Sequence, residues 1–346
     1  MRKLIVVSVA FPFAVVSADP VGGAEQILTR IDRALTDAGH RSIVVAAQGS
    51  LAAGELVGVP ACSGPIGRNE WGRAHKSLRE IIGQIVAQSG ADLVHMHGVD
   101  FQYYLPSPGV RVLATLHLPL TSYPPGSLDL TRPRTWANTV SRYQHERAGH
   151  HPRIACLIEN GVVAPPGPPT RKEPFALAMG RICPEKGFHL ALDAAKAANI
   201  PLKLAGSVSN FPEHRQYFED EIKPRLDDCR QWIGPVSGDF KWQLLQSAQC
   251  VLVPSLVPET ASLVAREALA AGTTVIAYPS GALAETIEDG RTGFLVNNVE
   301  EMTRALSRTR EIDPLCCRRI ANERYSAVRM AEEYLELYQQ LLQADE

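Results

Sequence analysis

Three features that often decide a protein's class are missing from this chain. Its 346 residues carry a formal net charge of −2, which gives no sign of the basic surface typical of nucleic-acid-binding domains. Its seven cysteines form no C-x-x-C pair, so neither a zinc ribbon nor a disulfide framework is expected, and a reducing cytosol is favoured. No apolar run approaches the ~20 residues of a membrane-spanning helix. The sequence therefore predicts a soluble globular protein long enough for two domains.

Two chemical signatures are also missing. No pair of carboxylates at a spacing suited to glycoside hydrolysis can be identified. No Asp-x-Asp motif, which would hold a metal-bound diphosphate, is present. The adjacent Asp227 and Asp228 lie in a polar stretch and are interpreted as a solvated helix end. Nothing in the sequence therefore indicates a hydrolase or a catalytic metal.

The first residues allow two interpretations. A basic start precedes an apolar run over residues 4–16, which resembles a short secretory signal. The alternative is a buried strand over residues 4–10, followed by a loop and a helix. We favour the strand, because Gly22 and Gly23 lead directly into an amphipathic helical pattern that a cleaved signal would leave without its strand.

Strand-like and helix-like segments alternate on both sides of one Pro-rich segment. Residues 164–174 are rich in Pro and Gly, which predicts a linker. The strands expected are residues 4–10, 42–47, 92–97, 111–117, 153–159, 175–179, 202–205, 250–254 and 274–278. The helices expected are residues 22–39, 73–89, 187–198, 240–247 and 326–342, with an irregular loop over 118–136. This pattern predicts an α/β protein with two doubly wound domains facing across a cleft.

The predicted domains are residues 1–164 and 165–325, followed by a final helical segment over residues 326–346. Met330, Tyr334 and Tyr338 recur at four-residue steps in that segment. Such a stripe favours packing against the first domain over a cofactor site.

Two glutamates eight positions apart are the most informative pattern. Glu259 lies in a Pro-containing loop and Glu267 in an amphipathic helix, between two strand-like runs. In an α/β domain this places a loop and a helix N-terminus at the carboxyl edge of a parallel sheet, where ligands bind. The helix start offers unpaired N–H groups to an anion, and the carboxylates accept hydrogen bonds from hydroxyls. The pattern predicts a sugar-nucleotide site.

The segment from Gly180 to Gly187 follows a strand and begins a helix. It contains Arg181 and Lys186, and a cation in a first helical turn opposes the helix dipole by ~0.3–1 kcal/mol. Natural sequences tend to break such rules at functional sites. A bound diphosphate would reverse the sign of the effect, with both cations neutralising it. The alternative interpretation is two solvated surface cations.

The first half of the chain offers weaker candidates. Gly22 and Gly23 follow the first strand, where backbone can approach a ligand, although a structural turn explains them equally well. His95 and His97 face one way on a strand, but no third metal ligand is nearby in sequence. His117 ends the next strand at the same sheet edge. It is the candidate for contacting the reacting centre, against the alternative of a structural histidine.

Basic residues surround Trp71. They would contact an anionic membrane surface, although a solvated helix face is the favoured interpretation. These residues are Arg68, Arg73, Lys76 and Arg79.

In combination these motifs resemble the retaining glycosyltransferases of family 4, through nearly the whole chain. The specific matches are Gly180-Arg181-x-x-Pro-Glu-Lys186-Gly, Glu259-x7-Glu267, the Ala-Leu-Ala-Ala-Gly that follows it, and Arg291-Thr-Gly293. Weaker matches are Gly22-Gly23-Ala-Glu, residues 92–98, residues 115–117 and residues 158–162. One departure concerns the Glu-x-Phe-Gly often found in the family. Here the sequence is Glu259-Thr-Ala-Ser262, so the pocket around the sugar is expected to differ.

The resemblance implies a GT-B fold, in which two Rossmann-like domains face across a cleft and the last helix crosses back to the first. It implies that Arg181 and Lys186 hold the diphosphate of the donor. Glu267 would bind the ribose and Glu259 the donor sugar. The other residues implied at the donor are Gly22, Gly23, Gly180, Thr260, Ala261, Ser262 and Leu263. The residues implied in catalysis are His117, Arg181, Lys186 and Glu259.

The reaction that the resemblance implies is transfer of a sugar from a nucleoside-diphosphate sugar to an acceptor hydroxyl, with retention of configuration. No metal or other cofactor is implied, and UDP or GDP is the favoured carrier. The acceptor expected is a glycan, a lipid-linked molecule or a small molecule, and the location expected is the cytoplasm or the inner face of the membrane. Two alternatives stay open: a nucleotide-sugar epimerase of the same architecture, and a non-catalytic nucleotide-sugar-binding protein.

Overall fold

The computed structural model describes residues 2–17, 20, 22–60 and 67–344. The chain divides into two compact units. Unit 1 comprises Met1–Asn160 together with Ala327–Glu346, and unit 2 comprises Gly161–Ser326. Of the seven cysteines, Cys62 lies outside the described residues.

Unit 1 is built on a seven-stranded parallel sheet with strand order β3-β2-β1-β4-β5-β6-β7. Its strands are β1 (Ile5–Val9), β2 (Arg41–Ala47), β3 (Glu55–Val59), β4 (Leu93–Met96), β5 (Arg111–Thr115), β6 (Thr135–Thr139) and β7 (Ile154–Leu157). In the centre of the sheet, Val7 pairs with Ile43 on one side and Val94 on the other. The strand interpretation of the first residues is therefore confirmed.

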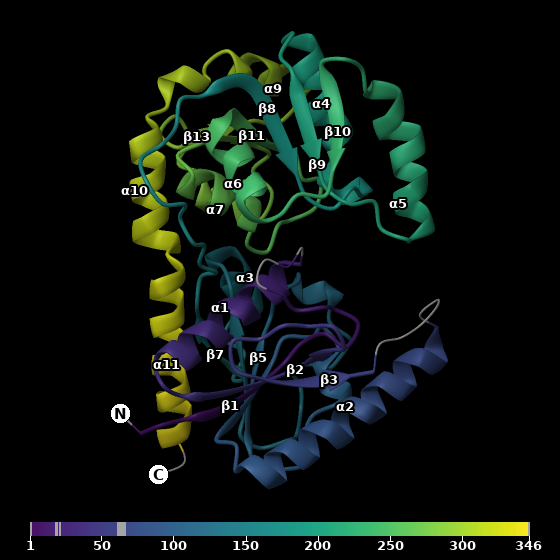
Figure 1. Cartoon of the computed structure of the whole chain (residues 1–346), viewed down its shortest axis with the longest axis vertical. Coiled ribbons are helices and arrows are strands. Elements are labelled where there is room, and N and C mark those ends of the chain that lie inside the picture. Colours follow the sequence, from purple (N-terminus) through teal and green to yellow (C-terminus); the bar gives the residue numbers. More distant parts are fainter. Residues whose placement is uncertain (1, 18–19, 21, 61–66, 345–346) are drawn as a thin grey trace. The chain divides into compact units, whose positions relative to one another are not determined.

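Helices cover both faces of this sheet, as Figure 1 shows. They are α1 (Gly23–Asp37), α2 (Arg68–Ser89), α3 (Arg142–Ala148) and α11 (Ala327–Gln343). Leu28 of α1 packs with Val44 on one face, whereas Leu78 of α2 packs with Val45 on the other. Each such buried aliphatic side chain stabilises the fold by about 1.5–3 kcal/mol. Successive side chains of β2 point to opposite faces of the sheet, so this strand contributes to the apolar core on each face.

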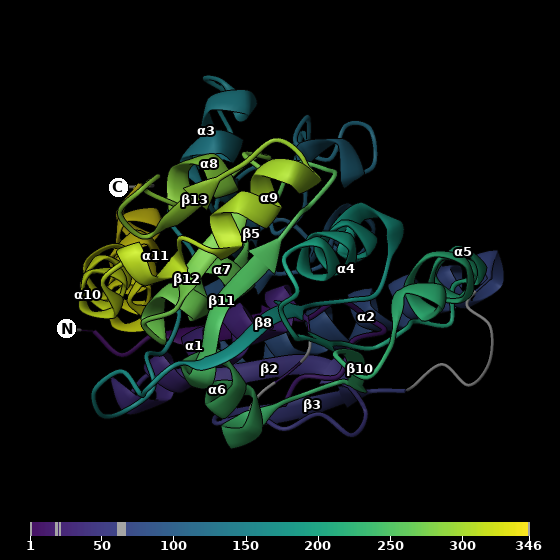
Figure 2. The same cartoon turned by 90° about the horizontal axis from the view of Figure 1, so that it is seen from above.

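Unit 2 contains a six-stranded parallel sheet of order β10-β9-β8-β11-β12-β13. Its strands are β8 (Glu173–Met179), β9 (Leu202–Ala205), β10 (Arg230–Gly234), β11 (Ala248–Val253), β12 (Thr274–Ala277) and β13 (Gly293–Leu295). Its helices are α4 (Phe188–Ala197), α5 (Pro212–Tyr217), α6 (Gly238–Ser247), α7 (Leu263–Ala270), α8 (Leu283–Thr286), α9 (Val299–Leu306) and α10 (Pro314–Tyr325). Figure 2 shows α4 and α6 on opposite sides of β8, and both helices contact that strand.

The strand order of unit 2 reverses between β8 and β11. From β8 the chain winds outward to β9 and β10, and then returns to the other side of β8 to form β11, β12 and β13. The loops that leave β8 and β11 consequently lie next to each other at the carboxyl edge of the sheet. Ligands of doubly wound sheets bind at such a switch point.

Some sequence predictions need correction. Asp227 is not on a helix end. Its Oδ1 accepts hydrogen bonds from the backbone N–H groups of Cys229 and Arg230, at 2.9 and 2.8 Å, in a turn that leads into β10. Lys186 is not in the first turn of α4 either, because it ends a separate 3-10 turn, Pro184–Lys186. The predicted linker ends earlier than expected, since Glu173 already begins β8.

Within the part of the chain that the structure describes, no helix combines the length and the apolar character needed to cross a bilayer.

Candidate functional site

Two loops of unit 2 are tied together at the switch point. The turn after β8 ends at Gly187, whose φ of +62° and lack of a side chain both matter. A Cβ on Gly187 would lie 2.3 Å from the carbonyl oxygen of Pro254, at the end of β11. The backbone N–H of Leu256 donates to the carbonyl of Glu185, at 2.8 Å, and joins the same two loops. Glycine therefore permits the close approach that brings the predicted cations and Glu259 together.

Lys186 and Glu259 form an ion pair. The Nζ of Lys186 lies 2.5 Å from Oε1 of Glu259, and the side chains are 28% and 12% exposed. Ser255 also donates its hydroxyl to this oxygen, at 2.5 Å. Burial alone would raise the pKa of Glu259, but the charge of Lys186 and the hydrogen bonds from Lys186 and Ser255 outweigh it. The pKa is therefore lowered, and Glu259 is a fixed carboxylate at neutral pH.

The backbone around Glu259 is held as firmly as its side chain. Its carbonyl accepts a hydrogen bond from the N–H of Ala282, at 2.8 Å, and its N–H donates to Ser280, at 3.3 Å. A Cβ on Gly281 would lie only 2.4 Å from the Glu259 carbonyl oxygen. The loop after β12 thus supports Glu259 from behind, and the carboxylate stays in one place when a ligand arrives.

Arg181 is the exposed member of this group of charges. Its side chain is exposed, and its guanidinium has no ion-pair partner among the residues that the structure describes. Its charge nevertheless contributes to lowering the pKa of Glu259. Arg181 is therefore near the Lys186–Glu259 pair and available to an anion. It follows Gly180, where φ is +151° and the chain leaves β8.

The N-terminus of α7 opens at the same edge of the sheet. Ser262 is its N-cap residue, and the hydroxyl makes no capping hydrogen bond to the first turn. Thr260, Ala261 and Ser262 are buried, and Leu263 begins the helix. The first N–H groups of a helix have no intrahelical partner, and the helix dipole favours an anion beside them. The site thus combines two cations, a carboxylate and helix N–H donors.

Glu267 is more enclosed than the sequence suggested. Its side chain is 2% exposed, and Oε1 lies 3.3 Å from Nζ of Lys241, which is 7% exposed. Lys241 belongs to α6, so this ion pair joins α6 to α7. Sequence reasoning missed Lys241 because its partner lies 26 positions away. A hydroxyl that bonds Glu267 would have to share a carboxylate that already has a cation.

In unit 1, Gly22 and Gly23 lie at the start of α1. Gly22 is the N-cap residue and Gly23 the first helical residue, with no side-chain capping bond. A Cβ on Gly22 would lie 1.8 Å from Oε2 of Glu25. The Glu25 carboxylate is the end of a flexible side chain and its helix does not require a glycine here, and the proposed contact of Gly22 with the donor stays a prediction.

Three histidines of unit 1 form one network, in which His95 and His97 are buried and His117 is partly buried. His95 is satisfied at both ring nitrogens, at 2.7 Å from the hydroxyls of Thr115 and Tyr338. His97 Nδ1 lies 2.9 Å from His117 Nε2, and the two rings stack. Desolvation by burial lowers the pKa of His117 to about 3, so the imidazole is neutral.

One nitrogen on each of His97 and His117 is buried without a hydrogen-bond partner in the described structure. Native structures rarely leave such atoms unsatisfied, and each one calls for a ligand, a water or a functional reason. The structural-histidine interpretation therefore fits His95 fully and His117 only in part. The described residues show no cluster of three metal ligands around these histidines.

Trp71, which the sequence placed in a basic surface, is held by other rings. Its ring centroid lies 4.9 Å from that of Phe13 and 5.7 Å from that of Phe11. A surface hollow beside it is lined by residues that include Lys76 and Arg79 of α2. The side chain of Arg68 lies outside the described residues. The structure thus describes Arg73, Lys76 and Arg79 of the predicted basic group.

Two family models match the chain, one in each unit. Residues 165–324 match the family described as glycosyl transferases group 1. Residues 21–158 match the family described as glycosyltransferase family 4. The two matches together span the chain apart from its ends and a short join.

Individual proteins show the same likeness. The chain is 37% identical to the lipopolysaccharide 1,2-N-acetylglucosaminetransferase of Salmonella typhimurium over 128 residues, which are 34% of this chain and a third (33%) of that protein. It is 27% identical to the phosphatidyl-myo-inositol mannosyltransferase of Mycolicibacterium smegmatis over 345 residues, 86% of this chain and 84% of that protein. HepE of Anabaena, solved in complex with UDP-glucose, has the same fold, with a TM-score of 0.73, 17% identity, and coverage of 97% of this chain and 100% of that chain.

Proposed function

We propose a reaction for this chain from the premise that it belongs to the family 4 glycosyltransferases and has their GT-B fold. The chain transfers a sugar from a nucleoside-diphosphate sugar to a hydroxyl of an acceptor. The observation that carries this proposal is the grouping of Arg181, Lys186 and Glu259 beside the uncapped start of α7. Cations and helix N–H groups suit a diphosphate, and a fixed carboxylate suits the hydroxyls of a sugar.

The step that this site favours is the departure of the nucleoside diphosphate from the sugar. As the bond between the sugar C1 and the phosphate oxygen breaks, negative charge grows on the diphosphate. Arg181, Lys186 and the N–H groups at the start of α7 stabilise that charge without any covalent bond to the protein. Glu259 holds Lys186 in place from the other side, at 2.5 Å. It also accepts a hydrogen bond from the donor sugar.

The acceptor attacks on the face that the leaving group vacates. Its oxygen forms the new bond to C1, and its proton passes to the departing phosphate oxygen, so that the configuration at C1 is retained. This route requires no carboxylate base, in keeping with the absence of a suitable carboxylate pair. His117, neutral because burial lowers its pKa to about 3, donates or accepts a hydrogen bond at the sugar rather than carrying charge.

The diphosphate is neutralised by protein cations and not by a metal ion. Mg²⁺ in phosphate sites is held by one or two carboxylates together with the phosphates. In this chain no Asp-x-Asp motif supplies them. Adding Mg²⁺ or Mn²⁺ to the purified protein should therefore leave turnover unchanged. A large rise on addition of either ion would contradict this part of the proposal.

UDP or GDP is the proposed carrier, with Glu267 on the ribose. The HepE structure contains UDP-glucose, which favours UDP. The acceptor we propose is a glycan or a lipid-linked molecule, because two relatives are named for lipopolysaccharide and for phosphatidyl-myo-inositol. For Arg73, Lys76 and Arg79 of α2, a solvated helix face stays the favoured interpretation, and a peripheral membrane contact is the alternative. Neither the families nor these relatives support the epimerase alternative.

A thermal-shift series tests the donor class. Purified protein is melted with UDP, GDP, ADP and dTDP and with the corresponding sugar nucleotides. A ligand of the native state raises the melting temperature, by mass action. The proposal expects a clear rise with the UDP or GDP series and, with the matching donor alone, slow release of the nucleotide by hydrolysis. No rise with any of them would refute it, and a new sugar nucleotide formed without acceptor would favour the epimerase.

A further inference from the structure

A second cluster of reactive side chains lies in unit 2. Cys183 and Glu185 flank Pro184 in the turn after β8, and His214 lies on α5. The thiol sulfur, a carboxylate oxygen and a ring nitrogen of these residues all lie within 4.8 Å of one another. Cys183 and His214 are buried, and Glu185 is exposed. None of the three contributes to the proposed transfer.

The histidine is oriented from behind. Its Nδ1 lies 2.5 Å from the hydroxyl oxygen of Ser209, which leaves Nε2 as the free nitrogen. The ring also packs edge-on against Phe211, with centroids 5.4 Å apart. A hydrogen bond to the second ring nitrogen is the usual means by which proteins fix the tautomer and direction of a metal-binding histidine.

The chemistry of the three groups points to one kind of ligand. A thiolate, an imidazole and a carboxylate are the donors that Zn²⁺ uses, and a site with three protein ligands keeps a fourth position for water. The separations need to change by about 1 Å for bonds of 2.0–2.3 Å to one ion. The turn is short and Glu185 is exposed, so a change of this size is available to it.

We propose that Cys183, Glu185 and His214 bind a divalent cation of the Zn²⁺ type, with water as the fourth ligand. On binding, the S–H bond of Cys183 breaks, its proton passes to bulk water and the sulfur donates an electron pair to the metal. No redox change is involved. The three ligands are different residues from those assigned to the diphosphate, although Lys186 lies in the same turn, and the proposal does not depend on the transfer reaction.

The metal adds a link between two segments that are already joined just upstream, where Ile182 pairs with Val208 and its N–H donates to Ser207 at 3.0 Å. It ties the turn carrying Lys186 to α5, while the Glu185 carbonyl already ties that turn to Leu256. The metal thereby holds the position of Lys186 without touching the substrate. Sequence spacing did not reveal the site, because His214 lies far along the chain from Cys183.

Cobalt(II) titration followed by absorption spectroscopy tests the site. A Co²⁺ ion bound to a thiolate shows a sulfur-to-metal charge-transfer band, and tetrahedral coordination gives strong visible bands. The protein is stripped with a chelator and titrated with Co²⁺ alone, and bound Co²⁺ is then displaced with Zn²⁺. The wild-type chain should bind one equivalent with these bands and lose them on Zn²⁺ addition.

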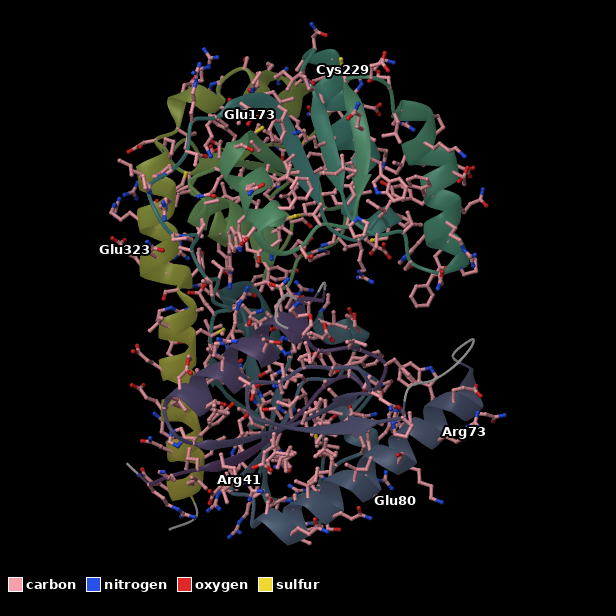
Figure 3. The ribbon with its side chains drawn as sticks, viewed as in Figure 1. Arg41, Arg73, Glu80, Glu173, Cys229 and Glu323 are labelled. Atoms are coloured by element: carbon pink, nitrogen blue, oxygen red, sulfur yellow. The ribbon has the colours of Figure 1, made fainter. Side chains whose placement is uncertain are left out.

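Variants assign the signal. Cys183→Ser should abolish the charge-transfer band, and His214→Gln should weaken Co²⁺ binding at least tenfold. The matched control is Cys229→Ser, because Cys229 is exposed. Figure 3 labels Cys229 and Glu173 at the same end of unit 2. Cys229 precedes β10 and Glu173 begins β8, whereas Cys183 and Glu185 follow β8, at the other edge of the sheet. The control should keep the wild-type spectrum.

Other outcomes overturn the proposal. It fails if the wild-type chain shows no thiolate band, or if Cys183→Ser keeps the band. Since Cys183→Ser could lose the signal by unfolding, the metal-free melting curves of all variants are recorded by circular dichroism. A folded His214→Gln that binds Co²⁺ as tightly as wild type also overturns it. No sugar nucleotide is present, so the result is independent of the proposed function.

Discussion

At the scale of single residues, the site depends on one exposed and one paired cation. Lys186 is fixed by Glu259, so removing it also leaves a largely buried carboxylate without its partner. Arg181 is exposed, and its side chain forms no ion pair among the described residues. Replacing Arg181 therefore measures its contribution to the reaction with little effect on the stability of the fold.

Replacing Arg181 by Ala should lower kcat/KM roughly 10- to 150-fold, the value of about 1.5–3 kcal/mol for a charged hydrogen bond. The melting temperature should stay close to that of the wild-type chain. Arg310→Ala is the matched control, because Arg310 is exposed elsewhere in unit 2. Steady-state kinetics gives kcat/KM, and thermal melting gives the melting temperature, of both variants and the wild-type chain. Equal activity of the two variants would contradict the role of Arg181.

The buried His95 and His97 and the partly buried His117 predict a pH dependence of stability. Burial lowers the pKa of His95 and His97 well below the usual value, and that of His117 to about 3. Each is neutral in the folded chain, whereas in the unfolded chain it binds a proton below about pH 6.5. Their contribution to stability is therefore present above pH 6.5 and is lost as pH falls, by about 1.4 kcal/mol per group per pH unit.

Urea unfolding at pH 7.5, 6.5 and 5.5 measures this loss. In His117→Asn the fall in the free energy of unfolding between pH 6.5 and 5.5 should be smaller than in wild type by about 1 kcal/mol, because an unfolded histidine is already half protonated at pH 6.5. His150→Gln, which changes an exposed histidine, should leave the fall unchanged. A wild-type chain as stable at pH 5.5 as at pH 7.5 would show that these rings are not buried in neutral form.

At the scale of elements, α6 and α7 are coupled through the buried pair of Lys241 and Glu267. Removing one member of a buried pair is destabilising, typically by about 3–5 kcal/mol, whereas apolar replacement of both is often tolerated. Lys241→Met and Glu267→Leu should each lower the free energy of unfolding. The double variant should lose less than the sum of the two.

A double-mutant cycle by urea unfolding measures the coupling. The matched control is Lys223→Met with Glu219→Leu, an exposed pair at i,i+4 spacing. Its members should lose no more than about 1 kcal/mol in total, as is usual for surface pairs. Additive losses for Lys241 and Glu267 would mean that the two helices are not coupled through this contact.

Calorimetry with UDP or GDP separately tests the ribose role of Glu267. If Glu267 binds the ribose, Glu267→Ala should bind the nucleotide more weakly than the wild-type chain.

The elements themselves could largely be predicted from sequence where apolar residues run together. β8, β9, β11 and β12 are short and mostly apolar, and the sequence predicts the ends of each within two residues. β6 (Thr135–Thr139) was missed because its Thr-Trp-Ala-Asn-Thr sequence shows neither an apolar run nor alternation, and its position in the sheet is set by β5. β10 was missed because it is an edge strand with exposed residues.

The site was predictable only where its residues share a motif. Arg181, Lys186 and Glu259 follow strands, so the edge of the sheet that carries them could be deduced. The 2.5 Å ion pair between Lys186 and Glu259 could not be, because it depends on the close approach that Gly187 permits. Lys241 and His214 come from α6 and α5, whose sequences give no sign of the residues that they face.

At the scale of the whole molecule, the chain interrupts one unit to build the other. Unit 1 ends at Asn160 and resumes at Ala327, so α11 belongs to unit 1 although the whole of unit 2 precedes it in the sequence. The ring nitrogen of His95 and the hydroxyl of Tyr338 meet at 2.7 Å although 243 positions separate them. Such a distant contact carries the entropic cost of closing a long loop.

Loss of this contact should therefore affect unit 1 as a whole. Tyr338→Phe removes one hydroxyl and leaves a buried nitrogen of His95 unsatisfied, at a cost of about 1–3 kcal/mol. Tyr143→Phe is the control, because this ring lies on the short helix α3 and is partly exposed. Urea unfolding should show a lower midpoint for Tyr338→Phe than for Tyr143→Phe. Equal midpoints would indicate that the contact between α11 and β4 adds nothing to stability.

The central claim is that the loops after β8 and β11 hold the diphosphate of an activated sugar. A crystal structure of the chain with the nucleotide sugar selected by thermal shift tests it most directly. The account predicts phosphate oxygens within hydrogen-bond distance of Arg181, Lys186 and the first N–H groups of α7, with a sugar hydroxyl on Glu259. Phosphates bound away from the carboxyl edge of unit 2, with Arg181 and Lys186 facing solvent, would contradict it.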